Sequence, residues 1–214
     1  MTKTLLILAV AAAIAAGCTM AERSRETANP RTPATTLAVQ VCSNCHGVEG
    51  NSVSPNFPNL AAQTQPYLTE QLGAFRKHSR SDPAGFEYMW GLSRNLTDEQ
   101  IKGLAAYFAS QKARPVTYAS GNPKLFDQGQ AIFKKGVPEK NIPACETCHG
   151  PEGLGNEQFP RIANQYADYI VKQLTVFQRT DERPEGAVMK VIAHDLTREN
   201  MQAVASYLEA LPLR

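Results

Sequence analysis

Four of the five cysteines in this 214-residue chain form two close pairs, and a histidine follows each pair directly. The first motif reads Cys42-Ser-Asn-Cys45-His46, and the second reads Cys145-Glu-Thr-Cys148-His149. Two thiols at this spacing can each form a thioether with one vinyl group of a haem, and the adjacent histidine can bind the iron. We therefore expect two covalently attached haem c groups, held by the four cysteines, with His46 and His149 as axial ligands.

Other uses of paired cysteines fit this pattern less well. Disulfides form in oxidising compartments, but they give no reason for a histidine after both pairs. A zinc ion would need one pair from each half of the chain, although each half looks complete by itself. A thioredoxin-type dithiol is expected in a βαβ setting, which the sequence does not show.

Methionine is the second axial ligand that fits both halves. A thioether opposite histidine raises the haem potential and occupies the sixth coordination position of the iron, as electron transfer without substrate binding requires. Met89 and Met189 each precede a Leu-Thr pair by seven residues. We expect both to be ligands; packing in a loop is the alternative. Met201 falls on the apolar face of the last expected helix and is predicted to lie in the core. His78 and His194 have no counterpart in the other half, so we expect them at the surface.

The motifs belong to a duplicated domain, because the similarity between the halves extends well beyond the cysteines. A period near 100 residues indicates a complete domain rather than a solenoid repeat. The matching segments are Glu49-Gly50 with Glu152-Gly153, Phe57-Pro58-Asn59-Leu60-Ala61 with Phe159-Pro160-Arg161-Ile162-Ala163, Gln71-Leu72 with Gln173-Leu174, and Phe75 with Phe177.

The elements that must position these side chains are all predicted to be helices. Apolar residues recur at helical spacing over 101–108 and 201–208, and two further helices are expected over 67–75 and 169–177. Thr97 and Thr197 stand where N-caps belong, and Gln100 completes a capping box with Thr97. No alternating strand pattern occurs, so the expected fold is all-α, with two tandem domains.

The boundary between the domains is expected between Pro115 and Pro123, where Gly121-Asn122-Pro123 supplies turn residues. We assign residues 34–118 to the first domain and 119–214 to the second. The second domain has an extra stretch over 134–143, predicted to be a surface loop. Its lysines, Lys134, Lys135 and Lys140, either form a basic patch or are simply solvated.

The N-terminal segment is typical of export. Lys3 precedes a run of 12 apolar residues, which is shorter than the roughly 20 that a membrane-spanning helix needs. We expect residues 1–17 to be a signal peptide, with Cys18 as the acylated residue of a lipoprotein; cleavage near Ala16 or Ala21 by the ordinary signal peptidase is the alternative. Residues 18–33 are polar and predicted to be a flexible tether.

Composition excludes several classes of protein. Hydrophobic residues make up 43% and charged residues 20%, as in an ordinary globular protein. The formal net charge of +2 is too balanced for a nucleic-acid-binding surface, so no nucleic-acid partner is expected. Each half is close to neutral, which argues against strong long-range steering of partners by net charge.

Taken together, the Cys-x-x-Cys-His-Gly motifs, the Phe-Pro-x-Leu/Ile-Ala segments, the Gln-Leu-x-x-Phe helices and the methionine before Leu-Thr resemble class I cytochromes c. The duplication is similar to that of the dihaem cytochrome c4 group, over about residues 34–213. The resemblance implies two helical domains, each with one low-spin His/Met haem, and a role for Pro58 and Pro160 in orienting the loop beside the haem. The tether with Cys18 departs from the family pattern.

The resemblance also implies a function. We expect a periplasmic carrier that passes single electrons between respiratory partners, such as a quinol-oxidising complex, a dehydrogenase or a terminal oxidase, rather than an enzyme. A cytochrome subunit of a larger dehydrogenase or oxidase complex is the alternative. A peroxidase-like haem enzyme would need an open iron position, which matched methionines argue against.

Overall fold

The computed structural model describes residues 26–116, 123–179 and 181–213. The expected signal peptide over 1–17, Cys18 and the first part of the tether lie outside these residues. So does the assigned boundary at 118/119. Within the described residues, no helix is both long and apolar enough to cross a membrane.

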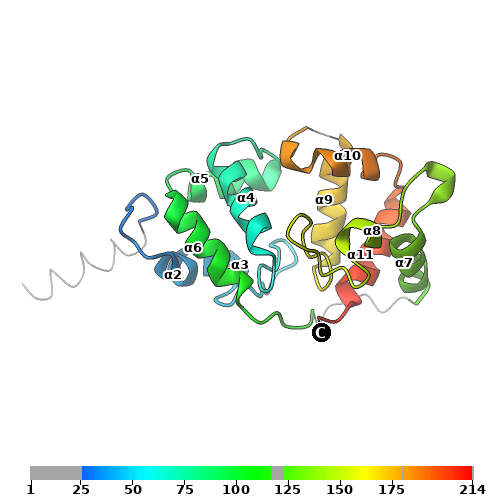
Figure 1. Cartoon of the computed structure of the whole chain (residues 1–214), viewed down its shortest axis with the longest axis horizontal. Coiled ribbons are helices and arrows are strands. Elements are labelled where there is room, and N and C mark those ends of the chain that lie inside the picture. The colour runs from blue at the N-terminus through cyan, green and yellow to red at the C-terminus, as the bar shows by residue number, and fades with distance from the viewer. Residues whose placement is uncertain (1–25, 117–122, 180, 214) are drawn as a thin grey trace, which may run out of the picture.

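The chain folds into two helical halves that lie side by side along its long axis (Figure 1). The first half contains α2 (Ala34–Leu37), the π-helix η1 (Ala38–Cys42), α3 (Ser43–His46), α4 (Gln65–Arg76), the π-helix η2 (Gly85–Met89), α5 (Trp90–Ser93) and α6 (Asp98–Ala109). The second contains α7 (Pro123–Lys135), the 3-10 helix η3 (Pro138–Lys140), α8 (Glu146–His149), α9 (Ala167–Arg179), the 3-10 helix η4 (Pro184–Gly186), α10 (Ala187–Ala193) and α11 (Arg198–Ala210).

The all-α prediction is confirmed. The four expected helices correspond to α4, α6, α9 and α11, each a few residues longer than its apolar pattern indicated. Among the described residues, β-type pairing is limited to one isolated bridge between Val137 and Ile142. The loop predicted over 134–143 is wrong in part, because Lys134 and Lys135 end α7 and the side chains of Val137 and Ile142 are buried.

The predicted helix starts are also confirmed. The Thr97 side chain accepts from the backbone N–H of Gln100, and the Gln100 side chain accepts from the backbone N–H of Thr97. Thr197 and Asn200 form an equivalent box at the start of α11. Reciprocal bonds of this kind satisfy backbone donors that a helix N-terminus would leave unpaired.

Each half has its own hydrophobic core. In the first, α6 packs against α2 and α4 around Leu37, Leu68, Leu104 and Phe108. In the second, α11 packs against α7 and α9, and Met201 is buried there as predicted.

The crossing of the N-terminal and C-terminal helices needs a glycine in both halves, but the glycine comes from opposite helices. In the first half, a Cβ on Gly103 of α6 would come within 2.6 Å of Ala34 Cβ on α2. In the second, a Cβ on Gly129 of α7 would come within 2.0 Å of Ala203 O on α11. Both domains therefore keep the close approach of their first and last helices, but the glycine that permits it lies on the last helix in one domain and on the first helix in the other.

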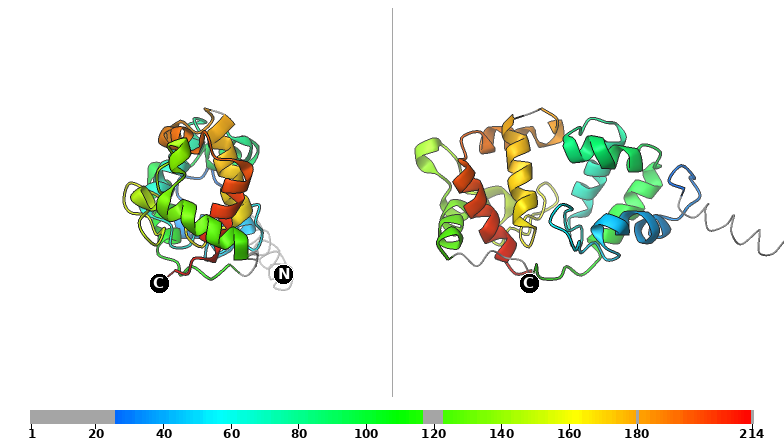
Figure 2. Two further views of the ribbon diagram at one scale, coloured as in Figure 1. Left: turned by 90° about the vertical axis from the view of Figure 1, so that its right-hand side faces the viewer. Right: turned by 180° about the vertical axis from the view of Figure 1, so that it is seen from behind.

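The end of the expected tether is fastened to the first half. The Gln100 side-chain amide donates to Asn29 O and to Thr32 O, both over 3.0 Å, and Thr32 is buried. The two halves also lie side by side when the molecule is viewed from behind (Figure 2), and hydrogen bonds cross the face between them. This face places α4 of the first half close to α9 of the second, as the hydrogen bonds described below show.

Candidate haem-binding sites

The first predicted axial histidine lies at the end of a short helix and is buried. His46 is the last residue of α3, and its Nδ1 lies 3.0 Å from the backbone oxygen of Pro58. A carbonyl can only accept, so Nδ1 must carry the proton and donate it, which leaves the lone pair of Nε2 free. Burial lowers the pKa of His46, although the bond to Pro58 opposes this, so the imidazole is neutral at pH 7.

The second predicted axial histidine repeats this arrangement. His149 ends α8, is buried, and has Nδ1 2.9 Å from the backbone oxygen of Pro160. Burial lowers its pKa as well. Tying one ring nitrogen to a backbone carbonyl is the usual way in which proteins orient a metal-binding histidine, and here it occurs at equivalent positions of both halves.

The glycine after each histidine ends the motif helix. Gly47 and Gly150 have φ/ψ values of 77°/154° and 80°/160°, a region that side-chain-bearing residues avoid. A Cβ on Gly47 would also lie 2.3 Å from Asn51 O. This turn sends the chain back across the motif, so that the Phe-Pro segment reaches the histidine: the rings of Phe57 and His46 lie 6.2 Å apart, edge to face.

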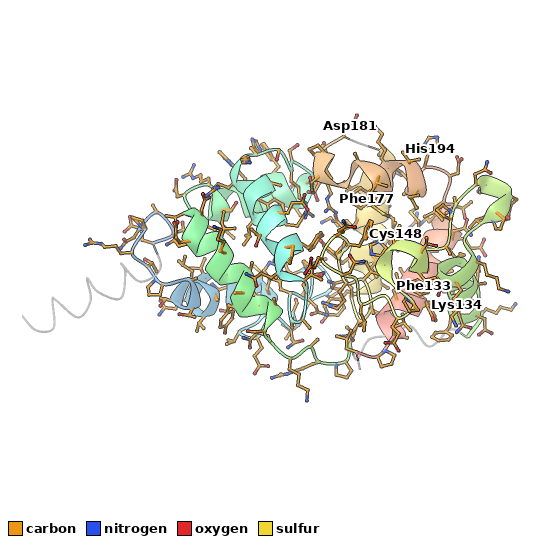
Figure 3. All side chains as sticks on the ribbon, viewed as in Figure 1. Phe133, Lys134, Cys148, Phe177, Asp181 and His194 are labelled. Carbon is orange, nitrogen blue, oxygen red and sulfur yellow. The ribbon has the colours of Figure 1, made fainter. Side chains whose placement is uncertain are left out.

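The four cysteines of the two Cys-x-x-Cys motifs are free thiols, on or beside the motif helices. Burial raises the pKa of Cys42 and of Cys145 to about 11, so both thiols stay protonated at neutral pH. Cys148 lies on α8 and is exposed (Figure 3). Within the described residues, no three His, Cys, Asp or Glu side chains are grouped so that they could hold a metal ion.

The two predicted axial methionines lie on helices rather than in loops. Met89 is the last residue of η2, and Met189 lies in α10, which packs against α9. Both side chains are partly buried, and Met189 packs against the core of the second half. In each half the methionine therefore comes from a different helix than the histidine does.

The remaining sequence candidates are exposed. His194 is exposed, as expected, at the end of α10 (Figure 3). His78 is also exposed, but its ring stacks on Phe86 and Trp90 at centroid distances of 5.5 and 4.8 Å. Lys134 lies on the side of the second half that faces away from the first (Figure 3).

Sequence reasoning missed the polar interface between the halves. Gln63 donates to Arg161 O and accepts from Arg161 N, over 2.9 and 2.8 Å. Gln165 makes the equivalent bonds, of 3.0 and 2.9 Å, with the backbone of Asn59. A signal was available in the sequence, because both glutamines follow the repeated Phe-Pro segment at the same distance.

Arg161 reaches across the same interface. Its guanidinium donates to Asn59 O, Ala61 O and Ala62 O of the first half over 3.0–3.3 Å, and to Ala163 O of its own half. Burial lowers the pKa of Arg161 to about 10, so the side chain still carries its charge at neutral pH.

These residues fit a c-type haem in each half. Each motif supplies two thiols and a neutral, oriented imidazole with a free Nε2, and the methionine predicted as second ligand lies on a separate helix. The arrangement is present twice, with the same backbone partner for each histidine.

An all-helical domain with a Cys-x-x-Cys-His-Gly helix and a methionine helix, present in tandem, defines a dihaem cytochrome of the c type. The cytochrome c family profile matches the chain twice, over residues 32–112 and 126–212, and the chain belongs to this family.

Among two-domain members, the chain is similar to cytochrome c4. It is 38% identical to cytochrome c4 of Pseudomonas aeruginosa over 175 residues, which cover 80% of this chain and 84% of that protein. The crystal structure of reduced recombinant cytochrome c4 from Pseudomonas stutzeri superimposes with a TM-score of 0.71 at 37% identity, covering 84% of this chain and 97% of that one. A thiosulfate dehydrogenase electron acceptor of Stutzerimonas stutzeri is 32% identical over 79% of this chain and 78% of its own length.

Proposed function

We propose that this protein is a periplasmic dihaem electron carrier in which His46 and Met89 bind one haem iron and His149 and Met189 bind the other. The observation that carries the proposal is the duplicated histidine geometry. Both histidines follow a Cys-x-x-Cys pair, both are buried, and both direct Nδ1 to a proline carbonyl at 2.9–3.0 Å.

Haem iron would supply the one-electron chemistry, and the residues of this chain would hold and orient the haem. Cys42, Cys45, Cys145 and Cys148 would attach the two groups covalently through thioether bonds. The bonds from Nδ1 to Pro58 and Pro160 fix the imidazole rings, so that little rearrangement accompanies electron transfer.

A dehydrogenase is the electron donor that we propose. The relative from Stutzerimonas stutzeri, named as the electron acceptor of thiosulfate dehydrogenase, shows that a protein of this kind can serve a dehydrogenase. Which oxidisable compound the donor acts on here depends on that enzyme and not on this chain. A terminal oxidase is the proposed acceptor, and Cys18 is the proposed lipid anchor on the periplasmic side of the membrane.

Haem content per chain tests the proposal. The full-length protein is produced in a bacterium with haem-attachment machinery, and c-type haem is quantified by pyridine haemochrome spectroscopy and intact mass. We expect two haems in the unmodified chain and one after replacing both Cys42 and Cys45 with alanine. The matched control, Cys18→Ala, should keep two haems but release the protein from the membrane fraction.

Absence of haem from the unmodified chain would overturn the proposed cofactor sites. Two haems together with unchanged membrane retention of Cys18→Ala would overturn the anchor alone. Co-purification of the untreated protein with a large subunit in fixed ratio would favour the alternative, a cytochrome subunit of a dehydrogenase complex, over a separate carrier.

A further inference from the structure

A buried network of charged and amide side chains joins the two halves at a second place. Arg80 donates to Oε1 of Gln71 in its own half and, over 3.2 Å, to Oε1 of Gln173 in the other. Arg183 donates to the same two oxygens, over 2.6 Å to Gln173 and 2.9 Å to Gln71. Each glutamine oxygen therefore accepts from the guanidinium groups of both halves.

Each arginine also holds a carboxylate two residues further along the chain. Arg80 Nε lies 2.9 Å from Asp82 Oδ1, with side chains 4% and 0% exposed. Arg183 Nε lies 3.0 Å from Glu185 Oε1, with side chains 5% and 9% exposed. The two positive and two negative charges balance, as buried ionic groups require.

The carboxylates stand at the start of the segments that carry the methionines. The backbone oxygen of Asp82 accepts from Phe86 N over 2.9 Å, and its Oδ1 lies 3.0 Å from where a Cβ on Gly85 would be. Asp82 therefore contacts the start of η2, the helix that runs from Gly85 to Met89. In the second half, Glu185 lies within η4, which leads directly into α10 and Met189.

A backbone contact adds to the link between these segments. Ser81 N donates to Glu182 O in the other half over 2.8 Å. The guanidinium carbons of Arg80 and Arg183 also lie 4.4 and 4.5 Å from the ring centroids of Phe75 and Phe177. Each guanidinium is therefore held by an aromatic ring as well as by its hydrogen bonds.

Given the haem ligation proposed above, we propose that Gln71 and Gln173 are positioning residues that couple the two axial methionines across the interface. Each glutamine sets the placement of the methionine segment in the opposite half as well as in its own. A substitution of Gln173 on α9 of the second half therefore alters the bond between Met89 and the first haem iron, although Gln173 does not contact Met89.

The test is Gln173→Leu in the haem-loaded protein, which removes the shared acceptor and leaves two buried guanidinium N–H groups unpaired. In the reduced protein, each haem-bound methionine gives a separate methyl resonance far upfield in the proton NMR spectrum, and Met89→His identifies the one from the first half. We expect Gln173→Leu to shift or broaden the Met89 resonance. The affinity of the oxidised first haem for added imidazole, which displaces methionine, should rise about tenfold, the effect expected for one lost buried hydrogen bond.

Gln178→Leu is the matched control. Gln178 lies on the same helix and donates to Ala193 O and Leu196 O, both over 2.7 Å, at the far end of α10. All its bonds stay within the second half, so its effect should be confined to the Met189 resonance. Gln173→Glu keeps an acceptor oxygen in place and should restore the Met89 resonance.

The possible failures are distinguishable. If the unmodified protein lacks upfield methionine resonances, the proposed ligation is wrong. If both resonances are present but Gln173→Leu leaves Met89 unchanged, the ligation stands and the coupling is refuted. Gln71→Leu provides the mirror measurement on Met189, and an effect on Met89 alone would refute the coupling in the same way.

Discussion

At the scale of single residues, the most constrained positions are the glycines that follow the two histidines. Both have backbone angles that only glycine adopts readily, but their surroundings differ. A side chain on Gly47 would meet Asn51 O, whereas one on Gly150 would meet nothing within 4 Å. The same motif position therefore carries two separable costs, backbone strain in both halves and steric overlap in the first alone.

Alanine substitutions separate these costs. We expect Gly150→Ala to lower the free energy of unfolding by about 1–3 kcal/mol, from backbone strain alone, and Gly47→Ala to lower it by more. Gly73→Ala is the control, because Gly73 lies within α4 and an added Cβ would meet nothing within 4 Å; this change should stabilise the protein by about 1 kcal/mol. Denaturant unfolding of the three haem-loaded variants measures this. Equal losses at Gly47 and Gly150 would contradict the overlap with Asn51.

At the scale of the helices, α6 and α11 begin with equivalent capping boxes, but the third residue of each box makes different further contacts. Both bonds found for the Asn200 side chain go to Thr197, at the start of its own helix. Gln100 caps α6 and also holds the backbone of Asn29 and Thr32. One side chain thus joins a helix end to the segment that precedes the first domain.

Limited proteolysis distinguishes the two roles. Gln100→Ala should expose the chain over 26–33 to proteases at least several-fold faster, because it removes both bonds to that segment, and should cost about 1 kcal/mol of stability from the lost cap. Asn200→Ala should cost a similar amount of stability without changing cleavage over 26–33. Equal cleavage rates in both variants would show that Gln100 does not fasten this segment.

At the scale of the whole molecule, the halves have separate cores but share buried polar contacts. Arg161 provides the largest single contribution, since three of its four acceptors belong to the first half. A buried carbonyl without a donor costs about 1–3 kcal/mol, and several are affected together. The halves are therefore expected to unfold as one cooperative unit.

Differential scanning calorimetry tests this cooperativity. The unmodified holoprotein should unfold in one transition. Arg161→Met should lower the midpoint and separate the transition into two, because the carbonyls of Ala61 and Ala62 lose their donor and that of Asn59 keeps only Gln165. Arg198→Met, at an exposed position on α11, should leave one transition near the original midpoint. Two transitions in the unmodified protein would contradict cooperative unfolding.

Sequence reasoning succeeded where local pattern decides structure. The apolar spacing located α4, α6, α9 and α11, and the Thr97–Gln100 box located a helix start. The motif residues identified the candidate haem sites, whose ligation stays a prediction. The interface was not predicted, because repeats such as Gln71 with Gln173 indicate duplication, and only the folded structure shows that these residues meet across the two halves. The Arg80/Asp82 and Arg183/Glu185 pairs were readable as a repeat, but nothing local indicates that such charges are buried.

The reciprocal bonds of Gln63 and Gln165 have a consequence for how such a molecule can arise. Each half offers the other an equivalent surface, which is the isologous geometry of a two-fold homodimer. Joining two such copies by a short linker makes their association intramolecular, with an effective concentration on the order of millimolar. Contacts far too weak to hold separate subunits together at cellular concentrations are then sufficient, and the two copies are free to diverge.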